Sequence, residues 1–241
     1  MDAAFFLGRR TRFIPRYFAA AIAPFREIQR KIDAAESPYD EPPAGFDPEY
    51  GEPAYLEEWI EADEAAQVVG WSAISLLGDS LKLYFKALEQ QLRFELSADG
   101  KTIAKKAGFV AAYQAAIGEI LDTDWTDCPV RFDVIEQIVL ARNRAQHGEH
   151  LSMLGARHDS KTLAKHQDLI FANEDELKMW VAEGADPETW MGPRLEISRE
   201  SLGTAIVEVQ KLADWIDERI SDAMARRRRQ DQESPQLGCG H

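Results

Sequence analysis

Apolar residues recur at intervals of three and four along most of the chain, which is the pattern of amphipathic helices. The longest such run lies between Tyr55 and Leu96, a stretch without proline whose stripe consists of Ile74, Leu77, Leu81, Tyr84, Leu88 and Leu92. This run predicts one long helix, or two helices joined near Gly70 or Gly78. The sequence SADG at 97–100 is typical of a helix end.

Three later segments have the same periodicity. Residues 102–121 predict a second helix, whose inner face consists of Ile103, Ala107, Val110, Ile117 and Leu121. A third helix is expected to open at Pro129, a favoured first helical position, and to end at Gly148, a favoured left-handed cap. Ser198 is predicted to cap the last helix, with Ile197 and Leu202 forming a hydrophobic staple.

The N-terminal part differs in composition. Residues 13–35 predict a basic helix, and residues 37–53 hold five of the eleven prolines, which predicts an extended linker. We therefore divide the chain into a basic helical extension with a Pro-rich linker (1–53), a helical domain (54–229) and a disordered tail (230–241). The domain contains a less periodic insertion at 149–193, for which one or two short helices are expected.

No segment alternates between apolar and polar residues with a period of two, so the predicted fold class is all-α. The expected architecture is an up-and-down helical bundle of four to five helices. An N-terminal helical extension and an insertion before the last helix complete it.

The charge is unevenly distributed. The formal net charge is −14, but residues 1–35 hold seven Arg or Lys and three Asp or Glu, and a further basic run occupies 226–229. Because the positive charge is local, the overall acidity does not exclude RNA as a partner. No stretch approaches the roughly 20 apolar residues that cross a bilayer. Only two cysteines are present, which favours a cytoplasmic setting without a disulfide framework.

The densest group of chemically active side chains is ARNRAQHGEH, residues 141–150, at the end of the predicted third helix. Arginine followed by histidine after four to six residues occurs twice there, in Arg142 with His147 and in Arg144 with His150. A chain of this composition gives about one such match by chance, so the spacing alone decides nothing. The context decides more, because the motif follows an apolar run and Gly148 then ends the helix.

These residues, ARNRAQHG, resemble the signature of the HEPN superfamily, compact helical domains in which Arg, a polar residue and a later His mark metal-independent ribonucleases. The resemblance covers roughly residues 55–225 in helix order and is specific only in the motif. It implies a homodimer with a composite cleft between two motif helices. It also implies that the protein acts as a toxin or phage-defence effector, with an antitoxin or nucleotidyltransferase as a possible partner.

The residue chemistry agrees with RNA cleavage by the 2′-hydroxyl of the substrate, which needs a proton-transferring group and a cation but no metal. His147 is the candidate for the first role and Arg142 for the second. The dipole at a helix C-terminus favours protonated imidazole, which predicts a general-acid role for His147.

Helix geometry places Arg142 and His147 about 140° apart, while Asn143 and His147 share a face. One regular helix therefore cannot direct both Arg142 and His147 at the same phosphate. Either His147 leaves helical geometry as the chain turns at Gly148, or a second copy of the protein supplies its own motif. Asn143 would then orient His147, as a third catalytic residue.

Other candidates have weaker claims. We assign substrate binding to Arg144, Gln146 and His150, with plain solvation as the alternative. Asp79 lies on a second apolar stripe with Leu76 and Leu83, where a carboxylate needs a partner, so it either orients Arg142 or His147 or forms a structural salt bridge.

No cofactor and no metal are predicted, because the histidine spacings fit no zinc pattern. Two rival hypotheses remain. One is a non-catalytic helical module that binds RNA, nucleotide or a protein. The other is a plain bundle in which Arg142 only caps a helix and His147 is an ordinary surface residue.

Overall fold

The computed structural model describes residues 2–47, 49, 51–146, 155–166, 168–182, 184 and 192–233, with side chains up to 223. Its described part is all-α, with eight helices and no strand; two isolated antiparallel bridges, Arg157 with Arg194 and Ala172 with Leu195, are the extended pairings there. The predicted class, an all-α helical bundle, is confirmed.

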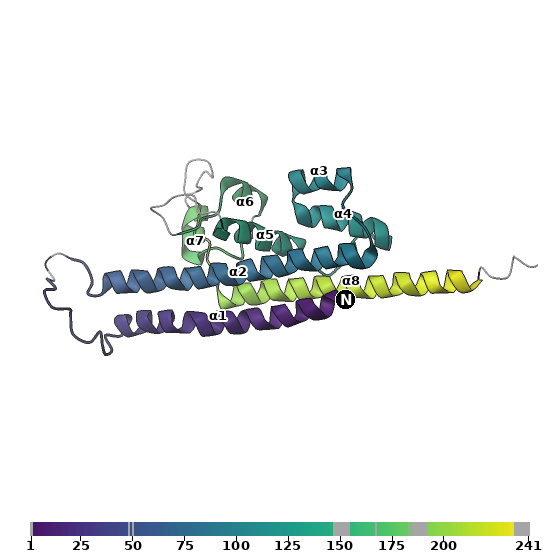
Figure 1. Ribbon diagram of the computed structural model, residues 1–241. Helices are drawn as coiled ribbons and strands as arrows, with labels where there is room; N and C mark the ends of the chain where they lie inside the picture. Colours follow the sequence, from purple (N-terminus) through teal and green to yellow (C-terminus); the bar gives the residue numbers. More distant parts are fainter. Residues whose placement is uncertain are drawn as a thin grey trace, which may run out of the picture.

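Three long helices form the body of the molecule: α1 (Ala3–Asp33), α2 (Leu56–Leu92) and α8 (Arg199–Glu233). They lie alongside one another, and the shorter helices gather on the side of α2 that faces away from α1 (Figure 1). α1 and α2 are antiparallel, since Tyr17 donates a hydrogen bond to Ser72 and Arg26 pairs with Asp63. The C-terminal part of α8 extends beyond the other helices (Figure 1).

α1 is longer at its start than the sequence predicted, because Asp2 caps it at 2.8 Å from the backbone N of Phe5. Pro15 and Pro24 lie inside the helix, and both are exposed. Carbonyls freed by a proline on the solvent side can be hydrated, which lowers the cost of interrupting the backbone ladder.

The opposite side of α1 is buried in the same hydrophobic core as α2, α4, α5 and α8, through Leu7, Ile14 and Phe18. The residues predicted as an extension thus contribute directly to the core of the bundle.

α2 is one helix, without a break at Gly70 or Gly78. Both glycines are buried where another segment approaches closely: a Cβ at Gly70 would lie 3.0 Å from Cβ of Ile197. The glycines in this helix therefore serve packing, not bending.

The single helix predicted over 102–121 is wrong: the structure has α3 (Ala98–Ala107) and α4 (Phe109–Leu121). Gly108 separates them with a φ of +92°, a conformation that side chains with a Cβ rarely adopt.

The start predicted for the third helix at Pro129 is also wrong, because α5 (Phe132–Gln146) begins later. Glu208 of α8 accepts a hydrogen bond from the backbone N of Arg131 at 2.8 Å, and the carbonyl of Arg131 accepts the first helical bonds. A carboxylate distant in the sequence thus anchors the start of α5 to α8.

The described residues of the insertion form two short helices, α6 (Ser160–Lys165) and α7 (Glu174–Ala182). α8 then begins where predicted, with the Ser198 hydroxyl accepting from the backbone N of Ser201 at 3.0 Å and Ile197 and Leu202 buried. The helix runs to Glu233, so the part of the predicted disordered tail at 230–233 is helical.

Acid is expected to weaken the insertion through His158. Its buried imidazole donates from Nε2 to the carbonyl of Phe171 at 2.8 Å, and burial lowers the pKa of His158 below its ordinary value of about 6.5. At pH values between the lowered pKa and the ordinary one, His158 is therefore protonated in the unfolded chain but neutral in the folded protein. The stabilisation is therefore present above about pH 6.5 and is lost as the pH falls through the folded-state value, by at most about 1.4 kcal/mol per pH unit.

Urea unfolding between pH 7 and pH 5 measures this effect. His158→Gln, whose amide can still donate to Phe171, is expected to show a shallower loss of stability over that range. An equal slope in the two proteins would contradict the assignment.

Candidate functional site

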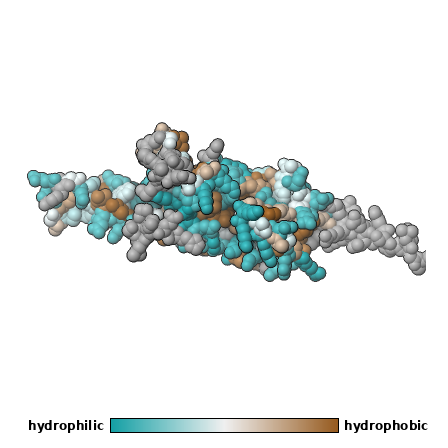
Figure 2. Space-filling view, turned by 90° about the horizontal axis from the view of Figure 1, so that it is seen from above, coloured by the Kyte–Doolittle hydropathy of each residue, from teal (hydrophilic) through white to brown (hydrophobic). Residues whose placement is uncertain are grey.

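A pocket of about 290 Å³ lies where α2, α4 and α5 meet, and it contains the N-terminal half of the sequence motif. We call it the Arg142 pocket. Its lining residues are Gly78, Lys82, Lys86, Leu96, Phe109, Tyr113, Val139, Arg142 and Asn143. The space-filling view of the molecule from the side of α3 to α7 shows a mainly hydrophilic surface with scattered hydrophobic patches (Figure 2).

The guanidinium of Arg142 is fixed by two neighbours. Its Nε and Nη2 donate to Oδ1 of Asp79 at 3.0 and 2.8 Å, and its Nη1 donates to Oδ1 of Asn143 at 3.1 Å. These bonds engage three of the five N–H donors of an arginine. The other two donors have no partner among the residues that the structure describes, and the side chain of Arg142 is 24% exposed. The group is thus oriented but still accessible.

The aliphatic stem of Arg142 lies against Gly78. A Cβ at position 78 would lie 3.1 Å from both Cβ and Cγ of Arg142. The absence of a side chain there lets α5 approach α2 closely enough for Arg142 to reach Asp79, which follows Gly78 directly.

Gly78→Ala is expected to displace Arg142 and to lower stability, because Cβ of Arg142 is tied to the α5 backbone and yields little. Gly203→Ala in α8 is the matched control, since no atom lies within 4 Å of a Cβ there. The control is expected to gain about 0.5–1 kcal/mol from the better helix propensity of alanine. Urea unfolding of both variants measures the difference, and an equal gain in both would show that α5 moves aside freely.

Two lysines give the pocket its excess positive charge. Lys82 and Lys86 are exposed, one helical turn apart on α2, and neither forms an ion pair with another residue that the structure describes. Asp79 offsets the charge of Arg142, so the lysines are the uncompensated cations of the pocket. In a chain with a net charge of −14, this local excess attracts anions.

Aromatic rings form the opposite wall. Phe109 and Tyr113 of α4 line the pocket, and Phe85 supports both: its ring stacks on Tyr113 at a centroid distance of 4.6 Å and meets Phe109 edge-on. The hydroxyl of Tyr113 donates to Glu89 at 2.6 Å. Burial, reinforced by that carboxylate, raises the pKa of Tyr113, so the phenol stays neutral and supplies neither an acid nor a base.

The other predicted site residues are dispersed. Arg144 forms an ion pair with Asp159, which also caps α6 by accepting from the backbone N of Thr162 at 2.7 Å. Arg144 is therefore partly buried against the insertion instead of solvated. Gln146 is exposed at the last residue of α5. His147, His150 and the expected cap Gly148 lie outside the described residues.

Sequence reasoning missed the residues that give the pocket its charge and its aromatic wall: Lys82, Lys86, Phe109 and Tyr113. The lysines did carry a signal, because a spacing of four on a long helix places two cations on one face. The aromatic residues carried none, because their convergence on α5 depends on the break at Gly108.

Among the residues that the structure describes, no group of His, Cys, Asp or Glu is arranged to hold a metal ion. Within the same residues, no helix combines the length and apolar character needed to cross a membrane. Comparisons with protein-family models, curated proteins and solved structures gave no match to this chain.

Proposed function

We propose that this chain is a metal-independent endoribonuclease that cleaves single-stranded RNA at the Arg142 pocket. One observation carries the proposal. The oriented Arg142 guanidinium shares an open pocket with Lys82, Lys86 and an aromatic wall, and within the described part of the chain two of its donors and both lysines have no partner. Phosphate groups and bases of single-stranded nucleic acid are bound by such a combination of cations and ring faces.

The chemistry follows from these groups. The 2′-hydroxyl attacks the adjacent phosphorus and loses its proton, the bond to the 5′ oxygen breaks, and that oxygen takes up a proton. The products are a 2′,3′-cyclic phosphate and a 5′-hydroxyl. Arg142 stabilises the charge on the pentacoordinate phosphate, and a base stacks on Phe109, which is only partly buried.

Proton transfer is assigned to His147, on the resemblance of the motif to the HEPN signature. A homodimer supplies two copies of His147, one as base and one as acid. Asn143 contacts Arg142 in the structure, so its role in this proposal includes holding the guanidinium. The same proposal includes that the protein acts in the cytoplasm as a toxin or defence effector.

The purified chain of 241 residues, with a chelator present, is expected to cut single-stranded RNA and to leave 2′,3′-cyclic phosphate ends. His147→Ala is expected to abolish the cut, and His158→Gln serves as the histidine control. Cleavage that needs added metal, or that leaves 3′-hydroxyl ends, would contradict the proposal.

A binding module without catalysis is the rival, favoured by the pairing of Arg142 with Asp79, which already neutralises the cation. Binding of RNA without any cleavage, at every concentration at which the protein is dimeric, would favour that rival.

A further inference from the structure

The exposed side of the first turns of α1 has an unusual composition. It consists of three phenylalanines and four arginines, namely Phe5, Phe6, Arg9, Arg10, Arg12, Phe13 and Arg16. No Asp or Glu occurs between Asp2 and Glu27. We call this surface the α1 face.

The phenylalanines of the α1 face are exposed although α1 already has a buried side. Phe6 and Phe13 are 49% and 58% exposed, while Leu7 and Ile14, next to them in the sequence, are 3% and 1% exposed. The ring of Phe13 stacks on Tyr17 at a centroid distance of 6.1 Å. A row of rings beside a buried stripe indicates a surface that contacts something else.

The arginines of this face are uncompensated. None of the four forms an ion pair with another residue in the described part of the chain, and Arg12 donates only to the backbone carbonyl of Gly8, at 3.1 Å. In an acidic protein, this face therefore attracts a polyanion.

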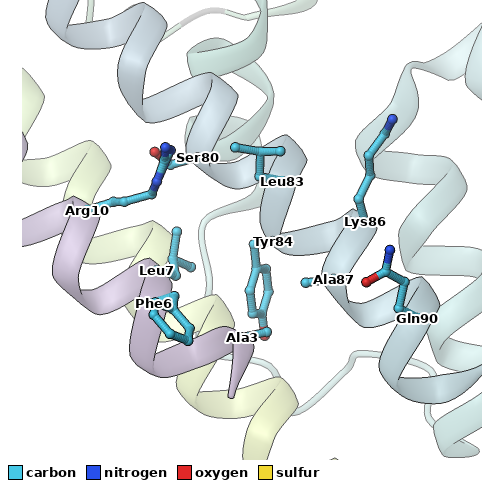
Figure 3. A pocket seen from close by; sticks show the side chains of 10 residues that line it. All are labelled: Ala3, Phe6, Leu7, Arg10, Ser80, Leu83, Tyr84, Lys86, Ala87 and Gln90. Atoms are coloured by element: carbon cyan, nitrogen blue, oxygen red, sulfur yellow. The ribbon is translucent and has the colours of Figure 1, made fainter. Parts of the chain in front are cut away.

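A second pocket, which we call the α1–α2 pocket, opens beside this face between α1 and α2 and has a volume of about 340 Å³. Its lining residues are Ala3, Phe6, Leu7, Arg10, Ser80, Leu83, Tyr84, Lys86, Ala87 and Gln90 (Figure 3). The pocket is mostly apolar, and the cationic side chains of Arg10 and Lys86 come from its two different helices. Its size falls within the range of small-ligand sites.

The α1 face and the Arg142 pocket are connected through α2. Lys86 is a lining residue of both pockets. The two pockets therefore adjoin at Lys86.

We propose that the α1 face and the α1–α2 pocket bind the single-stranded RNA that flanks the scissile phosphate. One base enters the pocket between Phe6 and Leu83, neighbouring bases stack on Phe13, and phosphates pair with Arg10 and Lys86. This inference rests on the proposed function, because it extends the path of the substrate. Continuity with the Arg142 pocket favours RNA over an anionic membrane, which would engage the exposed face but would not use a pocket between two helices.

Fluorescence anisotropy of the full-length protein tests this with labelled RNAs of about 6 and about 20 nucleotides, which bracket the reach of one binding groove. Wild type is expected to prefer the longer RNA. Arg10→Glu and Phe6→Ala are each expected to reduce that preference about tenfold, and Arg10→Glu to lower the salt dependence of binding. Lys178→Glu and Met179→Ala on α7, at positions that are also exposed but lie outside the α1 face, are the controls.

The outcomes separate the two proposals. If Arg10→Glu and Phe6→Ala keep the full preference for the longer RNA, or if phosphatidylserine vesicles displace it from this face, the present inference is overturned. Cleavage with cyclic-phosphate ends would still support the ribonuclease. If the long RNA binds through the α1 face and is never cut, the inference is supported and the proposed catalysis fails.

Discussion

Replacing Arg142 by alanine is expected to lower the rate constant kcat for RNA cleavage about 100- to 1000-fold, the range found when one donor to a developing negative charge is removed. The guanidinium is held by Asp79 and Asn143 before substrate arrives, so its alignment requires no rearrangement during the reaction. The loss should therefore appear in kcat more than in KM.

The stability of Arg142→Ala should change little, because the remaining partner, Asp79, is 44% exposed and can be hydrated. Arg131→Ala is the matched control: Arg131 also pairs with carboxylates, Asp133 and Asp168, but is absent from the Arg142 pocket. Steady-state cleavage assays measure both variants. A kcat for Arg142→Ala within about threefold of wild type would reduce the ion pair to a structural role.

Asp79→Asn probes the same ion pair from the other side. It keeps a hydrogen-bond acceptor for Arg142 and removes the compensating charge, so phosphate should bind more tightly while the guanidinium loses part of its alignment. A lower KM with a lower kcat is the expected signature, and a variant that matches wild type in both constants would contradict it.

The pairing of Asp79 with Arg142 was accessible from the sequence because periodicity assigned both residues to helix faces. A carboxylate on an apolar stripe needs a partner, and the motif helix offered an arginine. The contact itself depends on Gly78, whose role the sequence did not reveal. In a sequence, a glycine within a long helical run indicates a helix break as readily as a site of close packing. Only the position of α5 against Gly78 shows that packing is its role here.

The fold was predictable to the extent that local periodicity determines it. The faces of α2, α5 and α8 follow from their apolar spacing, and the helix class follows from the lack of alternation. The break at Gly108 was missed because apolar residues continue in helical register across it. The start of α5 was missed because Glu208, far along the chain, supplies the acceptor for Arg131.

The structure shows where the basic N-terminal segment lies relative to the other cations, which the sequence did not. Counting residues identified a basic N-terminal segment, but it did not show that Arg10 lies across a pocket from Lys86, or that Lys86 also borders the motif. That proximity arises from the antiparallel packing of α1 on α2, which the Pro-rich linker permits and the sequence alone left open.

Phe85→Ala is expected to lower the free energy of unfolding by about 3–5 kcal/mol, the usual cost of removing a large buried ring. Phe85 is 2% exposed and contacts Phe109, Tyr113 and Tyr84, so no neighbour can fill the space without leaving its own position. In a chain of this size the melting temperature should fall by roughly 6–20 °C.

Phe5→Ala is the control for stability alone, because its ring is 53% exposed and truncation should cost less than about 0.5 kcal/mol. Urea unfolding gives both values. Since Phe85 supports the aromatic wall of the Arg142 pocket, the same variant should also lose RNA affinity at temperatures where it remains folded. A folded Phe85→Ala protein with wild-type affinity would show that Phe109 and Tyr113 do not need this support, and that the wall contributes little to binding.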